Sequence, residues 1–118
     1  MIAKIYSATL DGIDAKIVQI EVDSSNGLPA MNIVGLAGAS IKESKERIRS
    51  CLRSSNYEYP ICRLSINLSP ADIFKAGTQF DLGIALGILV SSGQLKVDFA
   101  ATSLFLGEIS LDGLLRPV

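Results

Sequence analysis

The sequence predicts a single α/β domain in which helices pack on a sheet. Three observations carry this prediction. Segments in the first half alternate apolar and polar residues with the period of a strand, a middle segment has apolar residues at helical spacing, and residues 82–90 are apolar on every side. The chain has 118 residues, of which 48% are hydrophobic and 19% charged. It is therefore long and apolar enough to bury one substantial core, and a disordered chain is excluded.

A β-hairpin is expected at the start of the chain. Residues 2–10 form its first strand, Asp11-Gly12 is a two-residue hairpin turn, and residues 13–22 return as a half-buried antiparallel strand. The returning strand is expected to turn its apolar residues toward the core, namely Ile13, Ala15, Ile17 or Val18, Ile20 and Val22. A polar loop then leads to a short apolar strand at residues 31–36.

An amphipathic helix is expected next, over residues 40–55. Ser40 and Glu43 have the spacing of a capping box, in which each side chain satisfies a free N–H group of the helix start. The side expected to lie on the sheet carries Ile41, Ser44, Ile48, Cys51, Leu52 and Ser55. Glu43 and Arg47 have the i,i+4 spacing of an ion pair. Another strand is expected at residues 61–68, with apolar positions at Ile61, Leu64, Ile66 and Leu68.

Residues 67–93 are the stretch around which the chain is organised. A polar loop, residues 69–81, leads there into the buried helix 82–90. Asp81 at the helix start is expected to act as a cap and to favour the positive end of the helix dipole, with Lys75 as its partner. Gly93 has the place of a left-handed cap at the helix end. Gly83 and Gly87, which share one helix face, are expected where the sheet packs closely.

The last part of the chain has fewer signals. Residues 95–101 form a less regular connection, and Asp112-Gly113 repeats the hairpin signal. The sequence stops in what we expect to be a strand, and we expect the chain, residues 1–118, to be one domain of a longer protein. Cys51 and Cys62 are expected to be reduced thiols of a cytoplasmic protein. The longest uncharged run, residues 82–95, is too short to span a bilayer.

The loop 69–81 is the first candidate site. Ser69 is a candidate nucleophile and Lys75 its candidate base, because the chain has no histidine. We favour a structural role, in which Asp72, Lys75 and Asp81 form an ionic cluster that fixes the loop. No metal site is expected, since Asp72 and Asp81 are single carboxylates. No Walker A motif occurs, and the turn at residues 35–40 is better explained as a tight turn with a helix cap than as an anion site.

The second candidate site is a basic stripe, defined by Lys42, Lys45, Arg49 and Arg53, on the outer side of the amphipathic helix. A solvated helix face is the default interpretation, and phosphate contacts are the alternative. The net charge of −1 excludes a basic field over the whole domain. No aromatic residue interleaves the stripe, so base stacking is not expected.

The chain resembles the N-terminal domain of the ComM/YifB family, the magnesium-chelatase-like AAA+ ATPases of bacteria. The resemblance covers essentially the whole sequence. It is carried by Ala3-Lys-Ile-Tyr-Ser-Ala, Ser25-Asn-Gly-Leu-Pro-Ala, Asn32-Ile-Val-Gly-Leu, Lys42-Glu-Ser-Lys-Glu-Arg-Ile-Arg, Ile66-Asn-Leu-Ser-Pro-Ala-Asp, Phe80-Asp-Leu-Gly-Ile-Ala-Leu-Gly-Ile-Leu and Gly107-Glu-Ile-Ser-Leu-Asp-Gly-Leu-Leu-Arg-Pro-Val.

The resemblance implies an α+β two-layer sandwich of the Lon-protease-domain type, with a mixed sheet and two main helices. It also implies a homo-hexameric DNA motor of the cytoplasm, with no membrane partner. That motor promotes branch migration during natural transformation, and its ATPase module, which binds ATP and magnesium, follows this domain. No cofactor is implied for residues 1–118. The domain itself is expected to serve ring assembly and DNA contact.

Lon peptidases carry their serine in a Gly-Pro-Ser-Ala-Gly loop, and the resemblance aligns the loop of Lys75, Gly77, Gln79 and Asp81 with it. Gln79 then takes the place of the serine, and the partner lysine lies beyond Val118. Thr78 also departs from the proline usual there. Glutamine is not a nucleophile, so we expect a degenerate catalytic loop and no catalytic residue. A residual hydrolase or small-ligand site at 69–81, or a purely structural oligomerisation module, are the alternatives.

Overall fold

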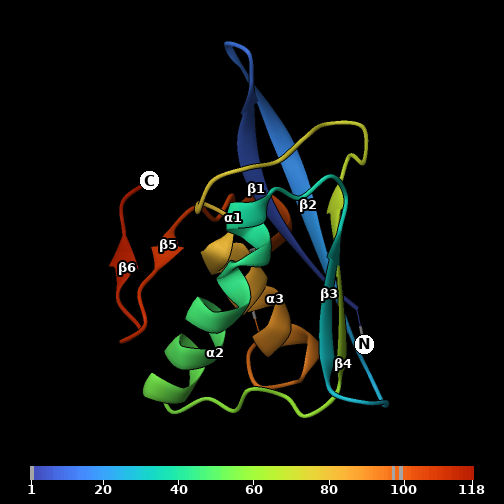
Figure 1. Ribbon diagram of the computed structural model, residues 1–118, viewed down its shortest axis with the longest axis vertical. Helices are drawn as coiled ribbons and strands as arrows, with labels where there is room; N and C mark the ends of the chain where they lie inside the picture. The colour runs from blue at the N-terminus through green and yellow to red at the C-terminus, as the bar shows by residue number, and fades with distance from the viewer. Residues whose placement is uncertain (1, 97, 99) are drawn as a thin grey trace.

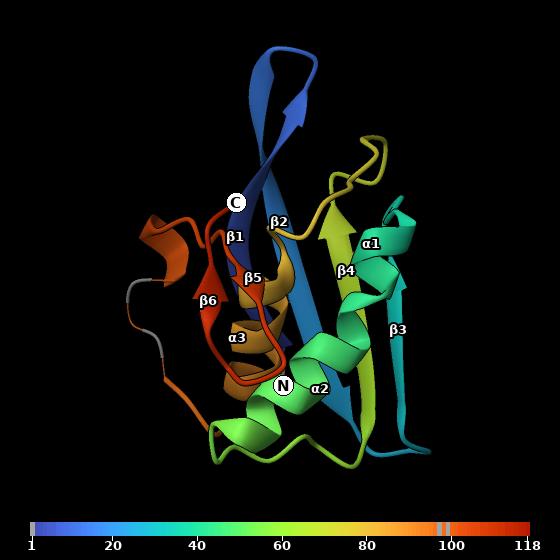
Figure 2. The same cartoon turned by 60° about the vertical axis from the view of Figure 1, so that its left-hand side comes forward.

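The computed structural model describes residues 2–96, 98 and 100–118. Its strands are β1 (Ile2–Asp11), β2 (Asp14–Ser25), β3 (Ala30–Val34), β4 (Arg63–Ser69), β5 (Glu108–Ile109) and β6 (Leu115–Arg116). Its helices are α1 (Ala39–Lys42), α2 (Ser44–Ser54) and α3 (Asp81–Ser91), with a 3-10 turn at Ala100–Thr102. The first four strands form a mixed sheet, and α2 and α3 cover one face of it (Figures 1 and 2). The predicted α+β class, with a mixed sheet and two main helices, is confirmed.

The sheet has the strand order β1-β2-β4-β3. Strands β1 and β2 pair antiparallel, with Asp11 opposite Asp14 across a turn in which Gly12 has a φ of +67°. Strand β4 pairs antiparallel with β2 and parallel with β3, so α1 and α2 form the crossover between two parallel strands. The predicted hairpin at Asp11-Gly12 is confirmed.

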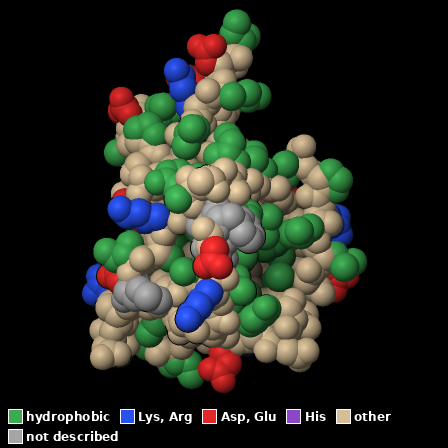
Figure 3. Space-filling view, turned by 180° about the vertical axis from the view of Figure 1, so that it is seen from behind, with side chains coloured by type: hydrophobic (Ala, Val, Ile, Leu, Met, Phe, Trp, Pro, Cys, Tyr) green, Lys and Arg blue, Asp and Glu red, His purple; other side chains and the backbone are tan. Residues whose placement is uncertain are grey.

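The β1–β2 hairpin extends beyond the helices, at the top of Figure 1. Its lower part packs on the core as predicted, through Val18, Ile20 and Val22, which are fully buried. Of the alternatives Ile17 and Val18, Val18 is the buried residue. The prediction was wrong for Ile13 and Ala15 near the tip, which are exposed together with Ile17. Side chains alternate between the two faces of a strand, so these odd-numbered residues lie on the face opposite to Val18, Ile20 and Val22. Figure 3 shows the rear of the molecule, where Lys and Arg side chains lie scattered among Asp and Glu.

Helix α3 is buried, as its uncharged sequence predicts. A Cβ atom on Gly83 would lie 2.6 Å from Ile20 Cδ1, and one on Gly87 would lie 2.5 Å from Val22 Cγ2. Both glycines therefore let the helix backbone approach β2, which confirms the predicted close packing. Gly93 follows the helix with a φ of +80°, as expected of a left-handed cap.

The amphipathic helix is present in two segments, α1 and α2, which meet at Glu43. The predicted capping box is wrong: Gly38 precedes α1, and no side chain caps either segment. Ser40 Oγ instead accepts a hydrogen bond from the backbone N–H of Gly77 at 2.9 Å. The predicted inner face is confirmed except at one position, since Ser55 is exposed while the others are buried: Ile41, Ser44, Ile48, Cys51 and Leu52.

Strand β4, the second hairpin, the connection 95–101 and the cysteines complete the comparison with the predicted fold. Strand β4 begins at Arg63, so Ile61 lies outside it and is exposed. The second hairpin is confirmed by the pairing of β5 with β6. In the connection 95–101, Val97 and Phe99 lie outside the described residues. Both cysteines are free, and burial raises the pKa of the Cys51 thiol. Among the helices that the structure describes, none is long and apolar enough to cross a membrane.

Candidate nucleic-acid surface on helix α2

The basic stripe lies on the outer side of α1 and α2. Lys42 and Arg53 are exposed, and Lys45 and Arg49 are half-buried. Within the described ranges, no ion pair engages Lys42, Lys45 or Arg53. Arg49 Nη1 lies 3.6 Å from a carboxylate oxygen of Glu46, and both side chains are open to solvent, so this pair contributes little. The stripe thus presents cations in a row, as contacts with successive phosphates require.

Two tyrosines lie beside the C-terminal half of the stripe, in the segment that follows α2. The Arg49 guanidinium carbon is 5.0 Å from the centroid of the Tyr59 ring, which is cation–π geometry. Tyr57 and Tyr59 line a hollow of about 590 Å³ together with Arg49 and Arg53. No aromatic residue interleaves the stripe in sequence, yet two lie beside it in space, because the segment after α2 folds back beside the helix.

Arg47, on the same helix, has a different role. Its Nε donates to Asp81 Oδ2 at 2.8 Å and its Nη2 donates to Asp81 Oδ1 at 3.0 Å. The Asp81 carboxylate, whose side chain is 2% exposed, also accepts the backbone N–H of Ile109. The hydrogen bond to Asp81 raises the pKa of the Arg47 guanidinium further. This bidentate pair joins α2 to α3 and to β5.

Both members of this pair have partners other than those predicted from the sequence. Arg47 pairs with Asp81 rather than with Glu43, and Asp81 does not pair with Lys75. Asp81 lies in the first turn of α3, as expected, but no side chain caps that helix. The carboxylate is held by Arg47 because the helix start faces α2 rather than solvent.

Lys75 is fully buried in the loop 69–81. Its ammonium group donates to the carbonyl oxygen of Gly35 at 2.7 Å and to that of Pro70. Burial lowers the pKa of Lys75, and the nearby Asp72 carboxylate offsets part of that effect. The predicted ionic cluster of Asp72, Lys75 and Asp81 is wrong, since Asp72 is exposed and Asp81 belongs to the Arg47 pair.

The backbone of the loop is tied to the segment before α1. The N–H of Lys75 donates to Leu36 O at 2.9 Å, and the N–H of Gly38 donates to Lys75 O at 2.8 Å. Ser40 holds Gly77 through its hydroxyl group. The expectation that the loop is structurally fixed is therefore confirmed, although carbonyl groups and backbone pairs do the fixing instead of carboxylates.

The residues proposed for chemistry in this loop have other partners. Ser69 Oγ accepts a hydrogen bond from Asn67 Nδ2 at 3.3 Å, while the Lys75 ammonium is bound to carbonyls. The Gln79 side chain donates to Ala76 O at 3.1 Å and borders a largely apolar hollow of about 400 Å³ beside the outer half of the β1–β2 hairpin. No group of three or more His, Cys, Asp or Glu side chains in the described part of the chain is placed to hold a metal ion.

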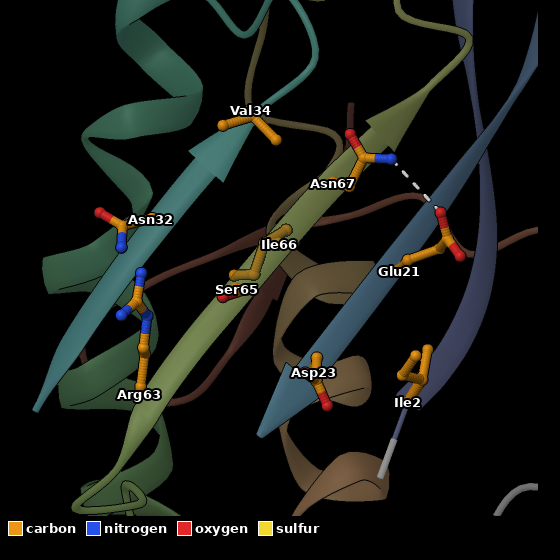
Figure 4. A pocket seen from close by; sticks show the side chains of 9 residues that line it. All are labelled: Ile2, Glu21, Asp23, Asn32, Val34, Arg63, Ser65, Ile66 and Asn67. Atoms are coloured by element: carbon orange, nitrogen blue, oxygen red, sulfur yellow. Dashed lines mark hydrogen bonds between the residues drawn. The ribbon is translucent and has the colours of Figure 1, made fainter. Parts of the chain in front are cut away.

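The sheet face opposite the helices is a further surface that sequence reasoning did not single out (Figure 4). A hollow of about 400 Å³ lies on it, lined mainly by polar side chains. Asn67 Nδ2 donates to Glu21 Oε1 at 3.3 Å, and Arg63 lies toward Asn32 on the neighbouring strand (Figure 4). Charges of both signs meet here, since Asp23 and Glu21 accompany Arg63, so this face has no preference for phosphate.

Comparison with known proteins identifies the relatives of the chain. A family model described as subunit ChlI of Mg-chelatase matches residues 20–118. The competence protein ComM of Haemophilus influenzae is 43% identical over 117 residues, which is 99% of this chain and 23% of ComM. The chain belongs to the ComM/YifB family. YifB of Salmonella typhimurium is 39% identical over the same share of each chain, and YifB of Escherichia coli is 41% identical over 107 residues, 91% of this chain and 21% of that protein.

The ComM/YifB relatives are much longer than the sequence described. The chain spans about a quarter of the length of these curated relatives. Residues 1–118 therefore match only one part of each of these relatives. The family assignment that the sequence motifs predicted is confirmed.

Two features of the surface could not be found by local sequence patterns. The Arg47–Asp81 pair joins residues that are 34 positions apart in the sequence. Helical spacing alone predicts that Arg47 pairs with Glu43, four positions before it. Tyr57 and Tyr59 follow the helix in sequence, outside its 3.6-residue period. Chain connectivity gave a weak signal for the two tyrosines. The segment that leaves the helix after Arg53 must run along the base of the sheet to reach the next strand, as it does in Figure 2.

Proposed function

We propose that this chain is the non-catalytic N-terminal domain of a ComM-type AAA+ ATPase, in which it contacts DNA and contributes to ring assembly. The match to ComM over nearly the whole chain supports the kind of protein. The stripe, defined above by its four cations, supports the DNA contact. In this proposal the domain has the Lon-protease-domain type of fold and has lost the peptidase, because Gln79 stands where the nucleophile would be.

The activity that we propose for the whole protein is ATP-driven branch migration of DNA during natural transformation. ATP and magnesium bind in its ATPase module, and the working form is a cytoplasmic homo-hexamer. Residues 1–118 supply no cofactor ligand in this scheme. Their contribution is to hold the DNA backbone while the ATPase module supplies the force.

The observation that carries the proposal is the contrast between occupied and unoccupied charges. Three charged side chains are used within the fold: Lys75 binds carbonyls, and Asp81 binds Arg47. The exposed cations of the stripe, Lys42 and Arg53, do not hold the fold together in this way. Among the described residues, no carboxylate forms an ion pair with either of them. Cations that do not hold the fold together are free to neutralise phosphates, and each phosphate neutralised releases condensed counterions.

A titration of duplex DNA tests this proposal. Reversing all four stripe charges to Glu is expected to weaken binding by at least tenfold and to flatten its dependence on salt between about 50 and about 200 mM. The matched control reverses four exposed cations elsewhere on the domain, Lys4, Lys16, Arg63 and Lys96. Both variants change the net charge equally, so only a local contact distinguishes them.

Equal affinities for the two variants would remove the stripe from the DNA contact. If neither variant nor the unmodified chain binds DNA while the chain self-associates in sedimentation, the domain is a structural oligomerisation module. The hydrolase alternative at 69–81 has weaker support, since Ser69 and Lys75 are each hydrogen-bonded to other groups. Peptide cleavage that depends on Ser69 or Lys75 would favour it.

A further inference from the structure

We propose that the hollow at the C-terminal end of α2 binds an unstacked nucleobase of a single DNA strand, with the adjacent phosphate on Arg53. The hollow, called here the Arg–Tyr hollow, is lined by Arg49 and Arg53 of α2 and by the segment after that helix, namely Tyr57, Glu58, Tyr59, Pro60 and Ile61, together with Pro29. The inference rests on the proposed function, because it names a second form of DNA held next to the stripe. The stripe alone would recognise only a charged backbone.

A rigid stacking platform is already assembled in the hollow. Tyr59 packs against the hydrophobic core, so its ring is fixed. The Arg49 guanidinium carbon lies 5.0 Å from the ring centroid, and 41% of the Arg49 side chain is exposed. A guanidinium held against an aromatic ring offers a flat, charged surface to a second flat ring, which is how arginine stacks on bases.

Tyr57 supplies an exposed aromatic ring next to this platform, with 38% of its surface open to solvent. The backbone on both sides is held in place: Tyr57 N donates to Leu52 O at 2.9 Å, and the backbone N–H and C=O of Glu58 both bond to the Gln94 side chain. Ile61 adds exposed apolar surface, at 88%. An exposed ring on a pinned backbone costs little conformational entropy when a ligand orders it.

The chemistry of the hollow favours a base joined to a phosphate. Two guanidinium groups and one carboxylate line it, so its charge is positive by one. Paired bases in a duplex have their faces covered by their neighbours, whereas a single strand presents them. Cations combined with aromatic rings are the combination by which proteins hold single strands without reading sequence. A free nucleotide also carries a base and a phosphate, so a competition with free nucleotide is needed to distinguish it from a single DNA strand.

Fluorescence anisotropy with three DNA probes tests the assignment: an oligothymidylate strand, an abasic strand of the same length, and a duplex. The unmodified chain is expected to bind the oligothymidylate more tightly than the abasic strand. Tyr57→Ala is expected to weaken binding of the oligothymidylate about fivefold, which is the lower limit of the affinity lost with one stacked base. Its affinities for the abasic strand and for the duplex are expected to stay unchanged. Tyr57→Phe is expected to restore binding, since the ring is retained.

Two further variants sharpen the result. Phe74→Ala removes an exposed aromatic ring that lies outside the hollow, at 61% exposure, and is expected to leave all three affinities unchanged. Glu58→Gln removes the one carboxylate that lines the hollow and is expected to tighten binding of both single strands. The charge-reversal test of the stripe uses the duplex, so its failure and the failure of the present inference are seen with different probes.

Equal binding of abasic and oligothymidylate strands by the unmodified chain would overturn the inference, as would an equal response to Tyr57→Ala and Phe74→Ala. Displacement of the strand by thymidine monophosphate at a matched concentration would assign the hollow to free nucleotides and overturn the strand assignment. Retained circular dichroism of Tyr57→Ala is the accompanying fold check.

Discussion

The loop 69–81 and the outer surface of α2 are both rich in polar residues, yet they use them in opposite ways. In the loop, Lys75 is buried and its ammonium group binds carbonyl oxygens, and Asp81 is buried against Arg47. At the end of α1 and near the end of α2, Lys42 and Arg53 extend into solvent. Charge that is buried with partners holds the fold, and charge left at the surface is available to a ligand. A loop placed like an active site can therefore be structural while a plain helix face is the better binding candidate.

The largest effect expected from breaking the buried set is that of Arg47→Ala. It leaves the Asp81 carboxylate buried without its guanidinium, which costs about 3 kcal/mol of unfolding free energy. Urea denaturation measures this loss. Arg53→Ala on the same helix is the control and should change stability by less than about 0.5 kcal/mol. Similar losses for both arginines would mean that the two regions do not differ as described.

Asp81→Ala should cost more than the roughly 1 kcal/mol expected for a helix cap alone. The structure gives Asp81 a bidentate arginine and the Ile109 N–H as partners, so its removal disconnects α2, α3 and β5 together. We expect about 2 kcal/mol, less than for Arg47→Ala because Arg47, whose side chain is 23% exposed, can still reach water. A loss of 1 kcal/mol or less, on the order of a cap, would restore the capping interpretation.

Lys75→Met is expected to cost about 1 to 2 kcal/mol at neutral pH, because two carbonyl groups lose their donor. The pH dependence gives a second readout. Burial lowers the pKa of Lys75 below its ordinary value of 10.5, so between these two values the unfolded chain binds more protons than the folded one. The stability contributed by this site therefore rises with pH across that window.

Urea titrations at several alkaline pH values measure the rise. The unmodified chain should gain stability relative to Lys75→Met as the pH approaches 10.5. Lys42→Met, which changes an exposed lysine, is the control and should follow the unmodified chain. Parallel curves for all three proteins would place Lys75 in solvent rather than in the core.

The smallest effect is expected for Ser40→Ala. It removes the hydroxyl that accepts the Gly77 N–H, a bond between groups that are only half-buried, and should cost about 1 kcal/mol. Ser54→Ala is the comparison and should cost less, because the hydroxyl of Ser54 donates to Leu111 O at 3.1 Å at an exposed site, where water can replace the bond. The difference reports how firmly the loop 69–81 is attached to α1. A Ser40→Ala protein as stable as Ser54→Ala would show that this attachment contributes nothing.

Most of the fold could be predicted because its signals are local. Strand alternation, the Asp11-Gly12 turn and the uncharged run of α3 depend on neighbouring residues, and all three are confirmed. The spacing of Gly83 and Gly87 even predicted where α3 approaches the sheet. Ile13 and Ala15 were wrongly expected in the core, because they lie on the strand face opposite to Val18, Ile20 and Val22. The other predictions that were wrong needed knowledge of which segments meet in space.

The candidate site was less predictable for the same physical reason. Helical spacing placed the stripe on one side of α2, but it paired Arg47 with Glu43 because only i,i+4 neighbours are visible in sequence. Tertiary packing brought Asp81 to Arg47 and Tyr59 to Arg49. Ser40, read as a helix cap, instead bonds to Gly77, because the loop 69–81 lies over the start of α1.

Backbone amide shifts of the isotope-labelled chain, followed by NMR during titration with duplex DNA, test the central claim most directly. If the stripe contacts DNA, the amide signals of residues 42–53 shift with added DNA and move back as salt is raised. The signals of residues 69–81 stay in place. Shifts confined to residues 69–81, with residues 42–53 unaffected, would contradict this claim and return the loop to the role of the site.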